Sequence, residues 1–350
     1  MLKTAQKNIR QLDLPSLEQY FETLGEKKFR AKQVYEWLWL KQAHSFEAMT
    51  NLSKELRAKL SENFSLPALT VDATQYSADG TIKSRFRTTD GHLVEGVLIP
   101  TDERKTACVS SQIGCSLSCK FCATGYMDRK RNLEFDEIYD EVVLINQQSE
   151  RVYNKKLSNI VFMGMGEPLL NYKNVMHAIE RITSPEGLGM SARRITVSTA
   201  GVAKMIKQLG DDKVRFKLAL SLHAANDIKR NEIMPINETN NLKALIEALN
   251  YFYQKTENEI TFEYILFKDF NDSLKDADEL IKICRQVPAD LVNIIEYNPI
   301  DAARYEKPEE ETVNQFMAYL ERHRVNARLR RSRGKDIDAA CGQLANKDQL

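Results

Sequence analysis

Three cysteines that lie close together constrain the chemistry of this chain more than any other feature. Cys115, Cys119 and Cys122 follow the spacing Cys-x3-Cys-x2-Cys, with Phe121 inside the same loop. An electron-carrying iron–sulfur cluster takes four cysteine ligands, and a structural zinc ion is normally closed by four Cys or His side chains. Three thiolates can instead hold three irons of a 4Fe-4S cube and leave the fourth iron without a protein ligand. The spacing therefore predicts a cluster that binds a further molecule, such as the amino and carboxylate groups of S-adenosylmethionine (SAM).

Two other interpretations of these cysteines remain open. A distant Cys or His could complete a zinc site. The three could also be small apolar core residues, although structural cysteines have no reason to gather at this spacing. Of the other cysteines, Cys284 lies in a helical pattern where only an inert packing role is expected.

The composition favours a cytoplasmic enzyme. A length of 350 residues exceeds that of a typical single domain, which favours a large α/β core with a smaller appended domain. No apolar run approaches the length that spans a bilayer, and the N-terminus lacks the apolar core of a signal peptide. Six cysteines are too few for a disulfide scaffold and indicate metal or redox chemistry in a reducing compartment. Because the net charge is only +1, any affinity for nucleic acid must come from local basic patches.

The first part of the chain predicts a small helical domain over residues 1–70. Basic residues between 27 and 32 stand beside Trp37 and Trp39, an interleaving that suits stacking and phosphate contacts with RNA, while a purely structural role for both tryptophans fits equally well. A β-hairpin turning at Asp90-Gly91 is predicted within a connection over residues 71–100. Glu95 interrupts its apolar second strand, so it either faces solvent or has a function.

Residues 101–335 alternate between apolar, β-branched stretches and amphipathic helical ones. The predicted strands are 107–113, 157–163, 193–199, 214–222, 259–267 and 291–297, which gives six strand–helix units. This alternation predicts a parallel sheet with helical crossovers, in the form of a partial (β/α)6 barrel. In such a barrel the active-site residues gather at the carboxyl ends of the strands. The remaining residues, 336–350, form a tail that carries Cys341.

The motifs resemble those of the radical SAM superfamily and, within it, the RlmN/Cfr family of RNA adenine methyltransferases. The resemblance covers roughly residues 80–345 and rests on the cysteine loop, on the Gly-Met-Gly-Glu-Pro motif at 164–168, and on Cys108 together with Cys341. It implies a radical SAM barrel, a small helical N-terminal domain, and one 4Fe-4S cluster held by Cys115, Cys119 and Cys122. SAM would then be both the methyl donor and the source of the radical.

The resemblance also implies a reaction sequence. C2 and C8 of adenine are not nucleophilic, so polar methyl transfer fails there and a radical must build the carbon–carbon bond. One SAM methylates Cys341, a second yields a radical that takes hydrogen from the S-methyl group, and the resulting methylene adds to the base. Glu95 is the implied proton acceptor. Cys108 then attacks the Cys341 sulfur, which releases the methylated base and forms a transient Cys108–Cys341 disulfide.

Further site residues follow from the same resemblance. Gly166 would allow close backbone approach and Glu167 would receive the SAM ammonium group. The other implied SAM contacts are Ser198, Ser221, Leu222, His223 and Asn298. A histidine after an apolar strand is usually structural, so His223 depends on the Ser-Leu-His motif more than on its chemistry.

The expected partners are 23S rRNA, certain tRNAs, and an electron donor such as flavodoxin or ferredoxin, with the chain itself a monomer. Residues 322–335 carry seven Lys or Arg and no acid, and Arg129, Lys130 and Arg131 add to this charge. Such a run is either a solvated face or an RNA contact.

The predicted product is 2-methyladenosine, because Pro168 in the Gly-Met-Gly-Glu-Pro motif resembles the residue found there in the C2 enzymes. The alternatives are Cfr-like methylation at C8 of 23S rRNA, which gives antibiotic resistance, and a non-enzymatic, metal-stabilised RNA-binding protein.

Overall fold

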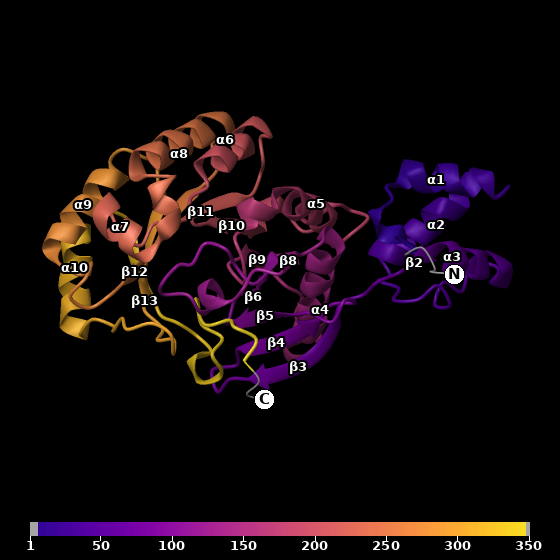
Figure 1. The fold of residues 1–350 in the computed structure, drawn as a ribbon, viewed down its shortest axis with the longest axis horizontal. Coiled ribbons are helices and arrows are strands. Elements are labelled where there is room, and N and C mark those ends of the chain that lie inside the picture. Colours follow the sequence, from indigo (N-terminus) through magenta and orange to yellow (C-terminus); the bar gives the residue numbers. More distant parts are fainter. Residues whose placement is uncertain (1–5, 348–350) are drawn as a thin grey trace.

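A ten-stranded sheet forms the centre of the protein, in the order β14-β13-β12-β11-β10-β9-β6-β5-β4-β3 (Figure 1). The computed structural model describes residues 6–347, so the first five residues of the predicted N-terminal domain and the last three of the predicted tail lie outside the described residues. The parallel strands are β6 (Lys105–Cys108), β9 (Asn159–Phe162), β10 (Ile195–Thr199), β11 (Lys217–Ser221), β12 (Ile260–Leu266), β13 (Leu291–Glu296) and β14 (Ala327–Arg330).

Helices connect these strands and cover the outside of the sheet (Figure 1). They are α4 (Phe135–Tyr153), α5 (Tyr172–Thr183), α6 (Ala203–Asp211), α7 (Asp227–Ile233), α8 (Leu242–Thr256), α9 (Leu274–Cys284) and α10 (Glu310–Arg322). All seven residues of β12 are buried, as expected for a strand covered on both faces. The six predicted strand–helix units are confirmed, except that the first strand ends at Cys108, and residues 112–113 of its predicted range form β7 (Gln112–Ile113), which pairs with β8 (Arg131–Asn132) in a separate sheet. β14 follows the six units within the basic run at 322–335.

The sheet continues beyond β6 with antiparallel strands. The predicted hairpin is confirmed as β4 (Ile82–Arg87) and β5 (Leu93–Pro100), and β5 pairs with β6. A third strand, β3 (Thr70–Tyr76), pairs with β4, and the sequence pattern did not predict it. None of its residues is buried, so it lacks the alternation between apolar and polar residues that marks a strand. These three strands, called here the antiparallel extension, lie beside the C-terminal segment in Figure 1.

The N-terminal helices stand at one end of the molecule, next to α4 and α5 (Figure 1). They are α1 (Leu14–Thr23), α2 (Lys28–Trp39) and α3 (Lys54–Asn63), with a short parallel pairing of β1 (Lys7–Asn8) and β2 (Phe64–Ser65). Trp39 is buried, which confirms its structural interpretation. Trp37 is half-buried: its indole N–H donates to Asn51 at 2.5 Å, and the Lys41 ammonium lies 4.2 Å from its ring centre.

A buried ion pair joins the N-terminal helices to the barrel. The Arg10 guanidinium donates to both carboxylate oxygens of Asp140 on α4, at 2.8 and 2.5 Å, and lies 4.8 Å from the centre of the Trp39 ring. Beside it, the Asn8 amide donates to Asp136 at 2.7 Å. Within residues 6–347, no helix is long and apolar enough to cross a membrane.

Candidate active site

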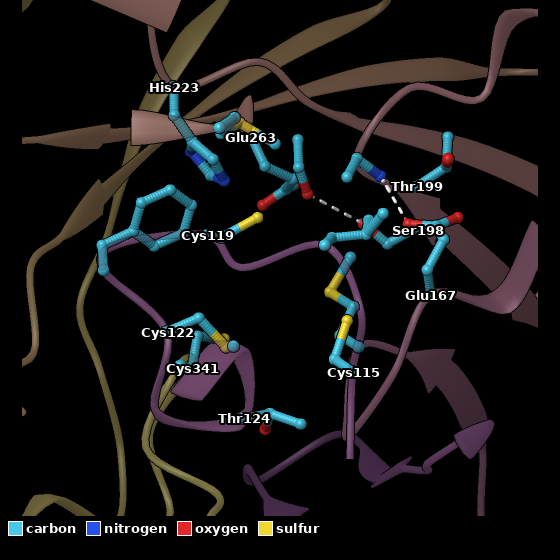
Figure 2. A pocket seen from close by; sticks show the side chains of 18 of the residues that line it. Cys115, Cys119, Cys122, Thr124, Glu167, Ser198, Thr199, His223, Glu263 and Cys341 are labelled. Atoms are coloured by element: carbon cyan, nitrogen blue, oxygen red, sulfur yellow. Dashed lines mark hydrogen bonds between the residues drawn. The ribbon is translucent and has the colours of Figure 1, made fainter. Parts of the chain in front are cut away.

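A cavity of about 140 Å³ opens at the carboxyl ends of the parallel strands. Its wall comes from the strands β9 to β14 and the loops that follow them, and from the loop that carries the three cysteines. Figure 2 shows several of the residues that line it. The polar and sulfur-bearing residues around it include Cys115, Cys119, Cys122, Thr124, Glu167, Ser198, Thr199, Ser221, His223, Glu263, Arg330 and Cys341. The fold therefore brings together most of the predicted site residues.

Cys115, Cys119 and Cys122 surround one side of this cavity (Figure 2). The loop closes on itself because the Cys122 N–H donates to the Cys119 carbonyl at 3.2 Å and the Gly125 N–H donates to the Cys122 carbonyl at 2.9 Å. Only glycine fits at position 125, since a Cβ there would lie 2.7 Å from the Cys119 carbonyl oxygen. The predicted cysteine loop is thus a tightly wound turn with its sulfurs facing the cavity.

The three thiols are suited to a cationic iron–sulfur cluster. Burial raises the pKa of Cys115 to about 11 and the pKa of Cys119 well above its usual value, and the charges of the neighbouring cysteines raise the pKa of Cys119 further. Thiolates packed this closely need a positive partner. Within residues 6–347, no three His, Cys, Asp or Glu side chains converge as a single metal ion requires. A 4Fe-4S cube binds each thiolate at a different iron, so its three ligands need not converge on one point.

Gly166 and Glu167 follow β9 as predicted. Gly166 has φ +93°, and a Cβ there would lie 2.5 Å from the Cβ of Gln112, so a larger residue would not fit at this position. The Glu167 carboxylate is buried and accepts hydrogen bonds from the backbone N–H groups of Leu169 at 3.1 Å and Ala200 at 2.7 Å. Burial raises the pKa of Glu167. The Thr199 side chain also bonds to this carboxylate, so three protein donors leave it about one lone pair for a ligand in the cavity.

His223 lies at the cavity wall in a left-handed backbone conformation, with φ +54°. Its Nδ1 accepts the N–H of Ile265 at 3.1 Å, so the proton of the neutral ring is on Nε2. Burial lowers the pKa of His223 to about 3, which keeps the ring neutral. The Phe121 ring packs edge-on against it at 4.7 Å. His223 can therefore donate one hydrogen bond into the cavity without carrying charge.

The remaining predicted SAM contacts divide into two groups. Ser198 and Ser221 line the cavity, and their hydroxyl oxygens lie 3.3 Å apart. Leu222 and Asn298 are buried but are not part of the cavity wall. The Asn298 amide donates instead to the carbonyl of Cys341 at 3.3 Å, so Asn298 supports the loop that carries this cysteine.

A second cavity of about 260 Å³ contains both Cys108 and Cys341. Cys341 also lines the first cavity, whereas Cys108 lines only the second. Burial raises the pKa of Cys108, and the nearby Cys341 raises it further. All six cysteines are free, so the expected Cys108–Cys341 disulfide is not formed in this structure. Cys284 lies on α9 away from both cavities, in agreement with its inert role.

Glu95 is 2% exposed, which excludes the solvent-facing alternative. Its carboxylate accepts the backbone N–H groups of Ala345 at 2.9 Å and Asn346 at 3.0 Å, and the Lys83 ammonium lies 3.7 Å away. Glu95 lines neither the first nor the second cavity, only a small pocket of about 10 Å³ that it shares with Lys83 and Lys347. In this structure it holds the chain that follows Cys341.

Three charged site residues escaped the sequence analysis as individual candidates. Arg230 is fully buried and donates to the carbonyl oxygens of Leu222, Ala200 and Ser221, which ties the loops after β10 and β11 together. Arg330 and Glu263 face each other in the first cavity, with an N–O distance of 3.4 Å. A carboxylate in the middle of a mostly apolar strand was the available signal for Glu263.

The basic residues around the site have partners in the structure. Arg131 is bound to Asp90 and Glu137, with distances of 2.7 Å to each. In the 322–335 run, Arg328 donates to Asn293 at 2.6 Å and Lys335 lies 2.6 Å from Glu296. Arg330, Arg331 and Arg333 line the second cavity. The run therefore forms part of the site wall and not a uniformly solvated face.

A partial parallel barrel with a three-cysteine loop at the carboxyl ends of its strands defines a radical SAM enzyme. Residues 109–281 match the model of the radical SAM superfamily, and residues 7–66 match the N-terminal domain of ribosomal RNA large subunit methyltransferases. Within that class, the chain belongs to the RlmN family of radical SAM RNA methyltransferases.

Relatives match over nearly the whole chain. A probable dual-specificity RNA methyltransferase RlmN from Cytophaga hutchinsonii is 58% identical over 98% of this chain and 93% of its own length. The dual-specificity RNA methyltransferase RlmN 2 of Myxococcus xanthus is 43% identical over 98% of this chain and 91% of its own. The crystal structure of a radical SAM methyltransferase from Sphaerobacter thermophilus superposes with a TM-score of 0.90, at 40% identity over 97% of this chain and 99% of that one. These relatives are enzymes, which removes the alternative of a non-enzymatic RNA-binding protein.

Proposed function

We propose that this protein methylates C2 of an adenosine in 23S rRNA and of the adenosine 3′ to the anticodon in some tRNAs, with Cys341 carrying the transferred carbon. The observation that supports this most directly is the position of Cys341 at both cavities, next to the cluster cysteines on one side and to Cys108 on the other. One sulfur can then receive a methyl group in the first cavity and exchange with a thiol in the second. The names of the relatives support dual specificity for RNA.

The residues of the first cavity would hold the cluster and SAM. Cys115, Cys119 and Cys122 would bind three irons, and Gly166, Glu167, Ser198, Ser221 and His223 would bind SAM. When bound, these groups supply the methyl cation equivalent and a 5′-deoxyadenosyl radical. Glu167 would accept from the SAM ammonium group and the neutral His223 would donate through Nε2. The proposal includes an external protein, such as flavodoxin or ferredoxin, as the electron source.

The chain's own residues would perform the remaining steps. The Cys341 thiolate would take a methyl group, and the radical named above would then accept a hydrogen atom from that S-methyl group. The new methylene radical would bond to C2 of the base, which joins enzyme and RNA covalently as a radical adduct. Loss of the C2 proton and of one electron, the latter to a one-electron acceptor such as the oxidised form of the electron-donor protein, would restore the aromatic ring. The Cys108 thiolate then attacks the Cys341 sulfur, the carbon–sulfur bond breaks toward carbon, and a proton completes the methyl group.

Glu95 is the proposed proton acceptor, and its surroundings set a condition on that role. Its carboxylate now faces the amides of Ala345 and Asn346 instead of a cavity. To reach a base held near Cys341, Glu95 requires this tail segment to move aside. Buried carboxylates near a reacting carbon are suitable general bases once they face it.

RNA would approach through the second cavity. Arg331 and Arg333 line it beside Cys108 and Cys341, so phosphates on either side of a target base would have guanidinium partners. The base would have to leave its stack to reach the sulfur, which favours loops and single strands. Action on rRNA and tRNA would place the protein in the cytoplasm, and one chain contains every proposed catalytic residue, in keeping with a monomer.

The test is a nucleoside analysis. Protein reconstituted anaerobically with iron and sulfide is incubated with reductant, SAM and either unmodified 23S rRNA or tRNA, and digests are compared with 2-methyladenosine and 8-methyladenosine by mass spectrometry. We expect 2-methyladenosine from both RNAs, lost in Cys341→Ala and retained in Cys284→Ala. An 8-methyl product would transfer the protein to the Cfr branch. Equal product from Cys341→Ala would contradict the proposed carrier, and product from rRNA alone would remove the tRNA activity.

A further inference from the structure

The loop that carries Cys341 has no helix or strand of its own to fix it. Residues 338–347 contain neither, so the position of the sulfur depends on individual hydrogen bonds. A reacting atom must come within about 3–3.5 Å of its partner in the right direction, and a misplacement of about 1 Å can cost about 100-fold in rate. The contacts that hold this loop therefore matter for the reaction.

Two of these contacts come from the cysteine loop itself. The backbone N–H of Ala123 donates to the carbonyl of Gly342 at 2.7 Å, and the hydroxyl of Thr124 donates to the carbonyl of Leu344 at 2.6 Å. Ala123 and Thr124 directly follow Cys122, the last of the three cysteines. The two chain segments are also in close backbone contact, because a Cβ on Gly342 would lie 3.3 Å from the Phe121 carbonyl oxygen.

Thr124 lies between the first cavity and the second cavity. Its side chain is 3% exposed and lines both the cavity with the cluster cysteines and the cavity with Cys108. The Thr124 hydroxyl is the side-chain group of the cysteine loop that donates a hydrogen bond to the segment after Cys341. If valine replaces it, the shape is kept and the Leu344 carbonyl loses a buried donor.

We propose that Thr124 is a positioning residue, which sets the distance between the Cys341 sulfur and the group bound by the three cysteines. The bond from Thr124 to Leu344 ties both partners of the hydrogen transfer to one short stretch of chain, 122–124. Movement of the cysteine loop would then carry Cys341 with it. This inference rests on the proposed function, since it takes Cys341 as the carrier of the transferred carbon.

The chain offers well-matched variants for a test. Thr124→Val removes the hydroxyl with little change in shape, and Thr124→Ser restores it. Thr81→Val is the control, because Thr81 is also fully buried and none of its hydrogen bonds among the described residues reaches residues 340–347. Iron and sulfide content is measured in each variant so that loss of the cluster is detected separately.

The first readout is the coupling between radical formation and product. For wild type and variants we measure 5′-deoxyadenosine and methyladenosine in the same reaction. We expect Thr124→Val to keep its iron content and to form about 10- to 100-fold more 5′-deoxyadenosine per methyladenosine than wild type, with Thr124→Ser close to wild type. An unchanged ratio, or a loss of iron from Thr124→Val, would overturn the positioning role.

The second readout needs neither cluster nor activity. Hydrogen–deuterium exchange of the metal-free protein is followed by mass spectrometry over peptides that contain residues 340–347. Thr124→Val should exchange at least about tenfold faster there than wild type, while Thr81→Val should not, because only the former loses a hydrogen bond to this segment. Equal exchange in the two variants would overturn the inference about Thr124. Failure of the wild-type enzyme to make methylated RNA would instead count against the proposed function alone, because the exchange measurement does not need activity.

Discussion

Glu95 accepts a hydrogen bond from the backbone N–H of Ala345 at 2.9 Å, four residues beyond Cys341. The same carboxylate oxygen accepts the N–H of Asn346 at 3.0 Å. Since charge-assisted hydrogen bonds are about twice as strong as neutral ones, the anion is well suited to hold the tail. The antiparallel extension thus anchors the segment on the far side of Cys341 from β14.

Glu95→Gln should loosen this anchor without removing it. The neutral amide keeps one acceptor oxygen but loses the charge, so we expect faster hydrogen exchange at the amides of Ala345 and Asn346, and less methyladenosine per hour. Glu103→Gln serves as the control because Glu103 is exposed on the loop before β6. Unchanged exchange in Glu95→Gln would show that the charge does not hold the tail.

Cys108→Ala should trap the enzyme on its RNA. Without the Cys108 thiol nothing can attack the Cys341 sulfur, so the carbon–sulfur bond to the base cannot break. We expect a protein–RNA adduct that survives denaturing gel electrophoresis and is absent in the double variant with Cys341→Ala. Cys284→Ala is the matched control, because burial raises the pKa of that thiol to about 12 and it lies away from both cavities. Normal release of methylated RNA by Cys108→Ala would contradict the proposed exchange.

His223 should make the protein less stable in acid. Burial lowers its pKa to about 3 in the folded state, against an ordinary value of 6.5, so the unfolded chain binds more protons between these limits. The free energy of unfolding therefore falls as the pH drops below about 6.5, by up to about 1.4 kcal/mol per pH unit from this residue. Above that pH its contribution is constant.

Urea unfolding from pH 8 to pH 4 tests this dependence. His223→Gln keeps an acceptor for the Ile265 N–H and cannot be protonated, so its stability should decline less steeply below pH 6.5 than that of wild type. His44→Gln, at an exposed position, should decline in parallel with wild type. Parallel curves for wild type and His223→Gln would contradict the prediction.

Arg10→Met should destabilise the contact between the N-terminal helices and the barrel. It leaves the Asp140 carboxylate buried with its main cationic partner gone, which typically costs about 3–5 kcal/mol. Limited proteolysis should then cut between the N-terminal helices and β3, and the urea midpoint should fall. The double variant with Asp140→Leu should recover much of the loss, because it removes the orphaned charge. No recovery would indicate that packing against Trp39 matters more than the ion pair.

Local patterns were enough to predict much of the fold. The six apolar stretches became parallel strands because their runs of apolar and β-branched residues favour burial within a sheet. The cysteine loop was predictable because its three cysteines lie within eight consecutive residues. β3 escaped because an exposed edge strand needs no apolar residues. Its pairing is dictated by β4 and not by its own pattern.

The site was predictable only where its chemistry is local. The position of Cys341 beside the cysteine loop depends on Thr124 and Leu344, which are 220 residues apart, and no spacing encodes that contact. Arg330 faces the cavity because β14 adds to the sheet beside β13, with Arg330 in register with Ile295. Glu95 and Glu263 share a usable signal, a carboxylate within an otherwise apolar strand, which marks a buried charge with a partner elsewhere in the chain.

The buried pair of Arg10 and Asp140 has a consequence for how substrates are chosen. It ties the segment that precedes α1 to α4 of the barrel, so the N-terminal helices are anchored to the barrel at this point. If the N-terminal helices bind RNA, the distance between the bound helix and the Cys341 sulfur limits which adenosines can reach that sulfur. Two RNAs of unrelated sequence would then both be substrates when each presents an unstacked adenosine at the same distance from the RNA stem that the helices bind. An RNA with the same local sequence but a different distance between stem and adenosine would not be methylated.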